Sequence, residues 1–173
     1  MKTHFALFAL LALMTVGCDD DDPTGPGNTD PLESDATLTG AAERPDPVTT
    51  DATGTATFTV TKGSTTGHDP DASGATTVTY SVSVTGLSGP ATMAHIHGPA
   101  GVEAAAGIIV PLTVTNTAGT TGVIISGSFT TTGNAAVSMD SLVVLMRNGN
   151  SYVNVHTAAN PPGEIRGQIV EEA

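Results

Sequence analysis

The stretch Thr53-Gly-Thr-Ala-Thr-Phe-Thr-Val-Thr61 places a threonine at every second position. A period of two puts Ala56, Phe58 and Val60 on one face of a β-strand and the threonines on the other. The stretch Val78-Thr-Tyr-Ser-Val-Ser-Val84 repeats the alternation with larger apolar residues. Both patterns predict strands that bury one face in an apolar core and present a hydroxyl-rich face outward.

Similar short stretches recur along the rest of the chain, and clusters of Gly, Pro, Asn and Ser separate them. Many short alternating segments with such breaks are typical of an antiparallel sheet folded onto itself. We therefore expect an all-β Greek-key sandwich or barrel of seven to eight strands. The further strand candidates are Ala36–Gly40, Met93–His97, Ile108–Thr115, Gly122–Phe129, Tyr152–Thr157 and Glu164–Val170.

One segment, from Ser138 to Gly149, follows a different period. Its apolar residues Met139, Leu142, Val143 and Met146 recur at the spacing of one face of a helix. Ser138 suits the N-cap, and Gly149 suits the left-handed residue that ends many helices. The pattern predicts one short helix near 139–147 that packs onto one end of the sheet, although Leu-Val-Val-Leu is also compatible with a strand.

The composition excludes several classes of function. Among 173 residues there are 5 Lys and Arg against 17 Asp and Glu, which gives a net charge of −12. Nucleic-acid binding requires clustered positive charge, so we expect no nucleic-acid partner. The single cysteine, Cys18, leaves no partner for an internal disulfide.

The N-terminus has the features of an export signal. Lys2 precedes an apolar run from Phe5 to Met14, which is too short to span a bilayer but suits the core of a signal peptide. Thr15-Val-Gly-Cys18 then resembles a bacterial lipobox, although Thr15 stands where such motifs usually carry leucine. We predict a signal peptide over 1–17 and lipidation of Cys18; the alternative is an ordinary secreted protein with an incidental cysteine.

The segment after Cys18 is acidic and rich in Pro and Gly, so it is expected to stay extended. We predict a tether over 18–35 and a β-domain over 36–173. The protein would then be exported and held on a cell-envelope membrane by its lipid anchor.

Three histidines fall on the side of their strands that faces away from the core. His95 and His97 lie two apart and share a face, because Ile96 between them belongs to the core. In the stretch from 152 to 157, Val153 and Val155 belong to the core, so Asn154 and His156 point away from it.

The last predicted strand adds Glu164 and Arg166 to the same side, since Ile165, Gly167 and Ile169 face inward. If these strands are neighbours, His95, His97 and His156 can bind one transition metal ion, copper or zinc. Asn154, Glu164 and Arg166 would support the site, with Glu164 accepting an imidazole N–H. The alternative is that the histidines and Asn154 only hydrogen-bond the backbone and Arg166.

Three motifs carry a resemblance to a known family. They are Ala94-His-Ile-His-Gly-Pro-Ala100, Tyr152-Val-Asn-Val-His-Thr157 and Pro162-Gly-Glu-Ile-Arg-Gly-Gln-Ile169. In this order they resemble the CHRD (chordin-type) domain, over roughly 37–170. The resemblance implies an extracytoplasmic β-domain that acts in protein interactions.

The order of the motifs is also similar, more distantly, to copper–zinc superoxide dismutase. That resemblance implies copper bound by His95, His97 and His156 and makes a copper-dependent dismutase the alternative function. The stretch 98–107, however, lacks the further His and Asp ligands of that enzyme. We expect a non-enzymatic binding module whose partner is an envelope or extracellular protein or a polymer.

Overall fold

The computed structural model describes residues 32–63 and 75–172 of the chain. The predicted signal peptide, Cys18 and the tether up to residue 31 lie outside these residues. The described elements are β1 (Leu32–Thr39), the 3-10 helix η1 (Gly40–Ala42), β2 (Thr53–Lys62), β3 (Thr76–Thr85), β4 (Ala91–His97), β5 (Ile108–Leu112), β6 (Gly122–Phe129), α1 (Met139–Arg147), β7 (Tyr152–Thr157), β8 (Ile165–Gln168) and β9 (Val170–Glu171).

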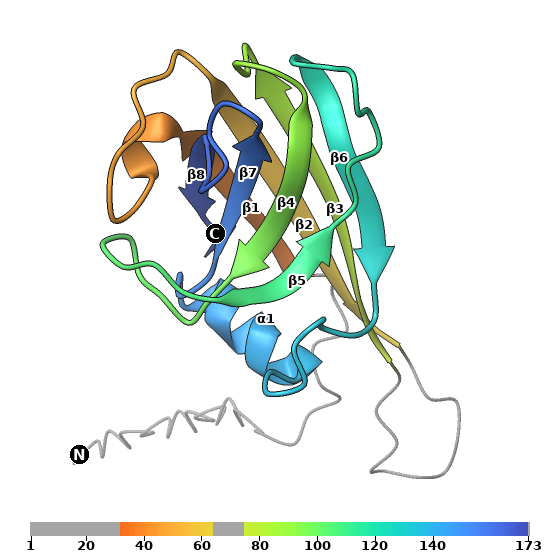
Figure 1. The fold of residues 1–173 in the computed structure, drawn as a ribbon. Coiled ribbons are helices and arrows are strands. Elements are labelled where there is room, and N and C mark those ends of the chain that lie inside the picture. The colour runs from red at the N-terminus through yellow and green to blue at the C-terminus, as the bar shows by residue number, and fades with distance from the viewer. Residues whose placement is uncertain (1–31, 64–74, 173) are drawn as a thin grey trace, which may run out of the picture.

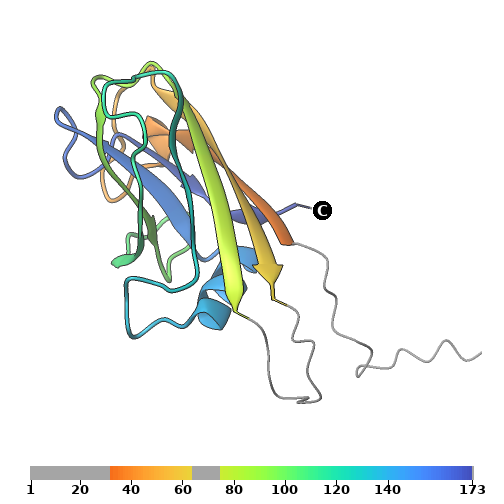
Figure 2. The ribbon, with the colours of Figure 1, turned by 90° about the vertical axis from the view of Figure 1, so that its right-hand side faces the viewer.

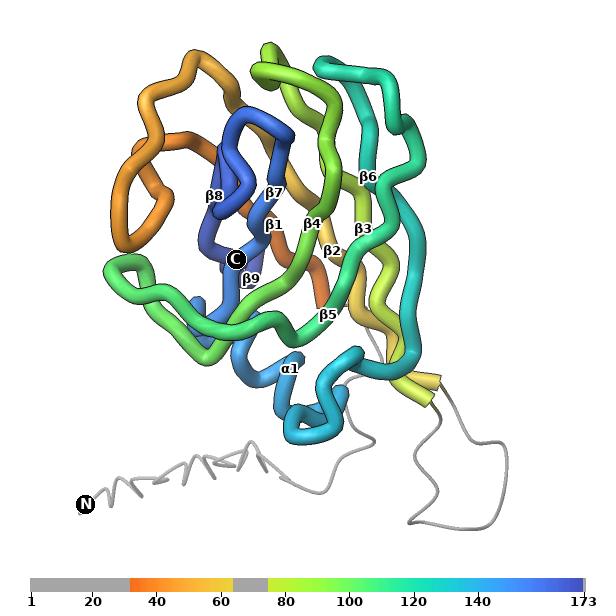
Figure 3. Tube along the Cα trace, viewed as in Figure 1, coloured from red at the N-terminus to blue at the C-terminus, as the bar shows by residue number. Residues whose placement is uncertain are grey.

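The strands form one antiparallel sheet in the order β5-β4-β7-β8-β1-β2-β3-β6, with β9 beside β1 (Figure 1). The chain beyond β5 approaches β6, where Val114 and Ile125 form a bridge. Backbone hydrogen bonds reinforce this contact, from Thr115 N to Ile124 O at 2.8 Å and from Ser126 N to Thr113 O at 3.3 Å. The two ends of the sheet therefore meet and nearly close it into a barrel (Figure 3).

The connectivity includes a Greek key. Strands β4, β5 and β6 follow one another around the barrel, and β3 lies on the far side of β6, next to it. Followed from β6 back to β3, three consecutive strands are succeeded by a fourth that lies beside the first, which is the Greek-key order. The predicted all-β antiparallel fold is confirmed, with nine strands among the described residues where seven to eight were expected, and Figure 2 shows the long strands β2 and β3 running side by side along one wall.

The alternation of β2 and β3 produces the core as expected. Ala56, Phe58 and Val60 are buried, while Thr55 and Thr57 between them are exposed. The core-facing residues of β3 are buried beside them, because the two strands pair in register over their whole length. Each strand therefore contributes its apolar face to one common interior.

The predicted helix is confirmed as α1, and it packs at one end of the barrel (Figure 1). The Ser138 side chain caps it by accepting a hydrogen bond from Ser141 N at 3.1 Å. Leu142, Val143 and Met146 are its buried residues, and Gly149 has the expected positive φ of 62°. No helix among the described residues is both long and apolar enough to cross a membrane.

Several boundaries differ from the prediction: β4 begins at Ala91 instead of Met93, β5 ends at Leu112 instead of Thr115, and two further segments differ more. Residues 32–35, which the sequence analysis assigns to the tether, belong to β1, where they pair with β2 and β9. The predicted strand Glu164–Val170 is divided into β8, which pairs with β7, and β9, which pairs with β1; between them Ile169 N donates to Ser151 O at 2.9 Å. Glu33 and Asp35 made residues 32–35 resemble the acidic tether, but the alternate residues Leu32 and Ser34 are buried, as in a strand.

Candidate metal-binding site

The three strands that carry the polar motifs are neighbours in the sheet. Strand β7 lies between β4 and β8, and Asn154 is paired with His95 on one side and with Arg166 on the other. His156 follows two residues after Asn154 and therefore shares its face. The topology thus brings His95, His97, Asn154, His156 and Arg166 to the same outer face of the sheet, as the sequence parity predicts.

This face is covered rather than open to solvent. His95, His97 and His156 are 9%, 8% and 6% exposed, and Arg166 is only 1% exposed. The covering segments are the connection 98–107, the turn 158–163 and the chain after η1, which all supply atoms that contact these side chains. The polar side chains therefore form a second buried layer, outside the apolar core.

Backbone carbonyls of the covering segments fix the tautomers of two histidines. The Nδ1 atom of His97 lies 3.0 Å from Ala106 O, and the Nδ1 atom of His156 lies 2.9 Å from Pro161 O. A carbonyl oxygen only accepts, so Nδ1 carries the proton in both rings. In the neutral state, the Nε2 atom of each ring then holds a lone pair, and that of His156 faces Nδ1 of His95 at 3.1 Å.

The ring nitrogens converge on one point. His95 Nδ1 lies 3.1 Å from His156 Nε2, and one nitrogen from each of the three rings lies within 4.8 Å of the others. Two nitrogens that share an ion at 2.0–2.1 Å lie at most about 4.2 Å apart. The His95–His156 pair already satisfies this limit, and small side-chain rotations would bring in the third nitrogen.

Burial also keeps the imidazoles in the form that binds metal. It lowers the pKa of His95 from 6.5 to about 4, and the neighbouring His156 and His97 add to the effect. Burial likewise lowers the pKa of His97 and of His156, against the opposing effect of their carbonyl hydrogen bonds. All three rings are therefore neutral at pH 7.

The Nε2 atom of His97 is buried and has no hydrogen-bond partner among the described residues. A buried acceptor without a partner costs free energy, and native structures contain few of them. An ion bound to His97 Nε2 would satisfy this atom. The donor set therefore fits a transition metal, for which neutral imidazole is a common ligand.

Tyr152 links His97 to Arg166. The rings of His97 and Tyr152 are stacked, with centroids 4.9 Å apart and planes 3° from parallel. The guanidinium carbon of Arg166 lies 3.5 Å from the centre of the Tyr152 ring, and Arg166 Nη2 donates to Gly101 O at 3.1 Å. Arg166 and Tyr152 therefore hold the ring plane of His97 rather than binding an ion themselves.

Glu43 is a member of this layer that the sequence analysis did not identify. It is 4% exposed, and its Oε2 accepts from Asn154 Nδ2 at 3.2 Å. Burial raises its pKa to about 7, although Arg166 and the Asn154 bond oppose the shift. The backbone of Gly163, with a φ of 143°, packs against this pair. A Cβ at residue 163 would lie 2.5 Å from the Asn154 amide and 2.7 Å from Glu43 Oε1, so only glycine fits there. No period or motif in the sequence around residue 43 marks it.

The structure gives Glu164 a different role from the predicted one. Its carboxylate accepts from Ser88 N at 2.8 Å, from Ser88 Oγ and Thr157 Oγ1 at 2.6 Å each, and from Thr50 Oγ1 at 3.0 Å. The imidazole N–H groups donate instead to the carbonyls of Ala106 and Pro161. Glu164 therefore joins loops at one end of the barrel and is not an acceptor for a histidine.

The sequence comparisons identify one family. A family model for the CHRD domain matches residues 34–169, which is most of the chain. No curated protein and no solved structure matches the chain. The comparisons therefore support the CHRD resemblance, and they give no support to the distant resemblance to copper–zinc superoxide dismutase.

The metal-free fold is expected to lose stability between pH 6.5 and pH 4. The histidines of the unfolded chain take up protons near 6.5, whereas burial holds the pKa values of His95, His97 and His156 lower in the fold. Their contribution is complete above pH 6.5 and is lost as the pH falls, by on the order of 3 kcal/mol for His95 with its folded pKa of about 4.

Glu43 acts in the opposite direction, because its raised pKa of about 7 makes its contribution complete below 4.5 and lost as the pH rises through 7. Three histidines outweigh this one carboxyl, so the net change on acidification is a loss. Urea unfolding with a chelator present, at pH 7.5, 6.5, 5.5 and 4.5, measures it. A free energy of unfolding that stays constant or rises over this series would contradict the buried neutral histidines.

Proposed function

The chain belongs to the CHRD domain family, and from this premise we propose that it is an extracellular binding module that holds copper or zinc in its three-histidine cluster. CHRD domains are extracellular modules, which agrees with the export signal predicted from the N-terminus. The observation that carries the metal proposal is the convergence of three neutral imidazole nitrogens within 4.8 Å.

The donor set suits an ion that accepts nitrogen ligands. Three imidazoles leave one position for a further ligand, as in many tetrahedral sites. A bound copper or zinc ion would act there as a Lewis acid. The chain's own contribution is to hold the rings, because Ala106 O and Pro161 O keep the proton on Nδ1 of His97 and His156.

The competing explanation is a purely structural cluster. The hydrogen bond between His95 and His156 and the two bonds to carbonyls would serve such a cluster without any ion. The hydrogen bonds of such a cluster do not reach the buried His97 Nε2, whereas a bound metal ion would give this atom a partner. For this reason we favour the metal.

We favour binding over catalysis, and the stretch 98–107 supports this choice. Its ionisable side chain, Glu103, is exposed and forms an ion pair with Arg44 at 3.2 Å. Glu103 is therefore exposed to solvent and adds no further metal ligand to the three histidines. A copper-dependent dismutase remains the alternative activity; superoxide turnover by the copper-loaded chain, compared with the metal-free chain, distinguishes it from a binding module.

The remaining parts of the proposal concern location and partner. We propose that Cys18 carries lipid and that the segment from residue 19 to β1 separates the barrel from an envelope membrane. The partner would be an envelope or extracellular protein or a polymer. The lipobox-like Thr15-Val-Gly-Cys18 supports the anchor, and the CHRD family supports the binding role.

The purified full chain should bind one equivalent of Cu(II) or Zn(II) at pH 7.5 in a calorimetric titration. His156→Ala removes one of three ligands and should weaken binding by about 100-fold or more, since loss of a supporting group alone costs about 10–100-fold at metal sites. Because burial lowers the histidine pKa values, wild-type affinity at pH 6.5 should remain close to its value at pH 7.5.

His68→Ala is the matched control, because His68 lies in the sequence outside the described residues and apart from the cluster motifs. This change should leave the affinity unaltered. Equal affinity in His156→Ala and wild type, or no stoichiometric binding by the wild type, would refute the metal site. A cluster with only a structural role would then account for the geometry.

The anchor is tested separately by Cys18→Ala. In a bacterial host that processes lipoproteins, the wild-type protein should partition with the membrane fraction and incorporate labelled fatty acid. Two or more acyl chains give stable anchoring, whereas one is marginal. The variant should fold but appear in the soluble fraction without label. A soluble, unlabelled wild type would show that Cys18 is an incidental cysteine.

A further inference from the structure

Strand β4 carries a β-bulge immediately before its histidines. Its register with β7 shifts between Ala91 and Met93, so two steps along β4 correspond to one step along β7. As a result, Ala91 and Ala94 are both buried although they lie three residues apart. The bulge therefore places Ala91 on the core face, whereas Met93, His95 and His97 after it share the opposite face by the ordinary alternation of a strand.

Met93 lies directly across from a predicted metal ligand. Its pairing partner on β7 is His156, and His95 follows it two residues later on the same face of β4. Directly opposed side chains have Cβ atoms about 4.5–5.5 Å apart, so the Met93 side chain leaves the backbone beside that of His156. Methionine has three flexible side-chain bonds, which allow its sulfur to turn toward the nitrogens of His95 and His156.

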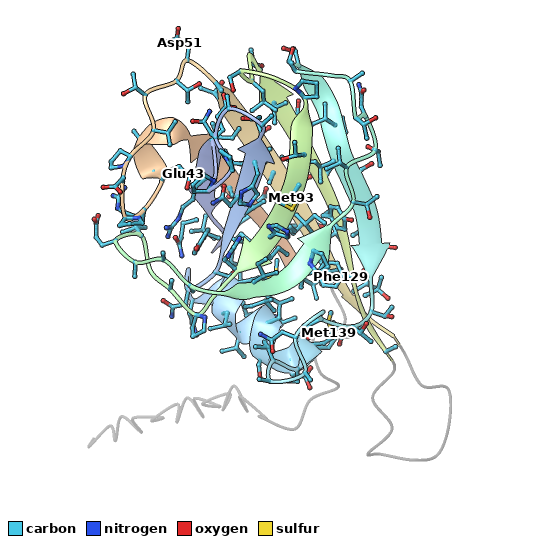
Figure 4. The ribbon with its side chains drawn as sticks, in the orientation of Figure 1. Glu43, Asp51, Met93, Phe129 and Met139 are labelled. Carbon is cyan, nitrogen blue, oxygen red and sulfur yellow. The ribbon has the colours of Figure 1, made fainter. Side chains whose placement is uncertain are left out.

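The exposure of Met93 contrasts with that of its neighbours. It is 48% exposed, whereas the three histidines are at most 9% exposed. Figure 4 shows it on β4, away from the other labelled methionine, Met139, which lies at the α1 end. A single exposed apolar side chain is ordinary on a protein surface. What distinguishes Met93 is its place at the uncovered edge of a cluster that loops cover elsewhere.

We propose that the Met93 thioether is the fourth ligand of the site and that the ion the site selects is Cu(I). This inference rests on the proposed metal-binding function and specifies its metal. Thioether sulfur is a soft ligand that favours Cu(I), whereas imidazole alone serves zinc and copper alike. The three-histidine set is common to both metals, so the sulfur decides between them.

The charge of the donor set agrees with a monovalent ion. Three neutral imidazoles and a thioether supply no negative charge, and the buried carboxyls Glu43 and Glu164 hydrogen-bond Asn154 and hydroxyl groups instead of a histidine. A buried charge is costly unless it is compensated, and the cost rises steeply with the charge of the ion. The site would leave one positive charge uncompensated with Cu(I) and two with Zn(II).

The test compares Cu(I) and Zn(II) affinities of the full chain and three variants. Cu(I) affinity is measured anaerobically by competition with a chromophoric chelator, and Zn(II) affinity by calorimetry. Met93→Leu preserves side-chain size but removes the sulfur, and it should lower Cu(I) affinity at least about tenfold, a loss typical when a group that supports a metal is removed. Zn(II) affinity should stay within about twofold of wild type.

Met139→Leu is the matched control, since it removes a methionine sulfur at the α1 end of the barrel, away from Met93, and should change neither affinity. His156→Ala separates the two proposals, because it should weaken both metals. Unchanged Cu(I) affinity in Met93→Leu, together with loss of binding in His156→Ala, would overturn the role of Met93 and leave the histidine site standing. Absence of binding by the wild type would overturn the site itself.

Discussion

One face of strands β4, β7 and β8 carries polar side chains, and the rest of the structure depends on the loops that cover this face. The alternation that sends Ile96, Val153 and Val155 into the core sends histidine, asparagine and arginine to the opposite side. Polar groups buried there must find hydrogen-bond partners or lose free energy. The partners are carbonyls of the covering loops, so the loops and the polar layer stabilise each other.

Two groups of contacts hold these loops in place. At the centre of the face, His97 and Arg166 bind the carbonyls of Ala106 and Gly101, which fixes the connection 98–107. At the end of the barrel, Glu164 accepts hydrogen bonds from Ser88, Thr157 and Thr50 and thereby joins segments from three parts of the chain. The loops held in this way shield the histidines from water, and this burial lowers the histidine pKa values, which leaves three neutral donors side by side. The fold thus creates the chemical state that a metal site requires.

Much of this arrangement could be predicted from the sequence. Strand parity placed His95, His97 and His156 on one face, and the helical spacing from Met139 to Met146 located α1. Successive side chains of a strand point to opposite faces of the sheet, and this alternation does not depend on which strands are neighbours. The sequence did not show which strands lie next to one another. The structure shows that β7 lies between β4 and β8, which brings the three polar motifs together.

The depth of the site could not be predicted, because it depends on how loops fold back over the sheet. Glu43 lies in such a loop, and nothing in its sequence surroundings distinguishes it from a surface carboxylate. Glu164 precedes β8 and joins the loops of the barrel end instead of a histidine, because its carboxylate accepts hydrogen bonds from Ser88 and Thr157. The burial of Ala91 depends on a bulge that no residue in Ala91-Thr-Met93 signals.

The most direct test of the central claim is a crystal structure of the protein grown with copper, using anomalous diffraction at the copper edge. The account predicts one strong peak between His95 Nδ1, His97 Nε2 and His156 Nε2, with all three nitrogens drawn to about 2.0–2.1 Å from it. A copper peak elsewhere, with His97 Nε2 bonded to an ordered water between unmoved rings, would contradict it. The buried polar layer would then be a hydrogen-bonded support for the loops alone.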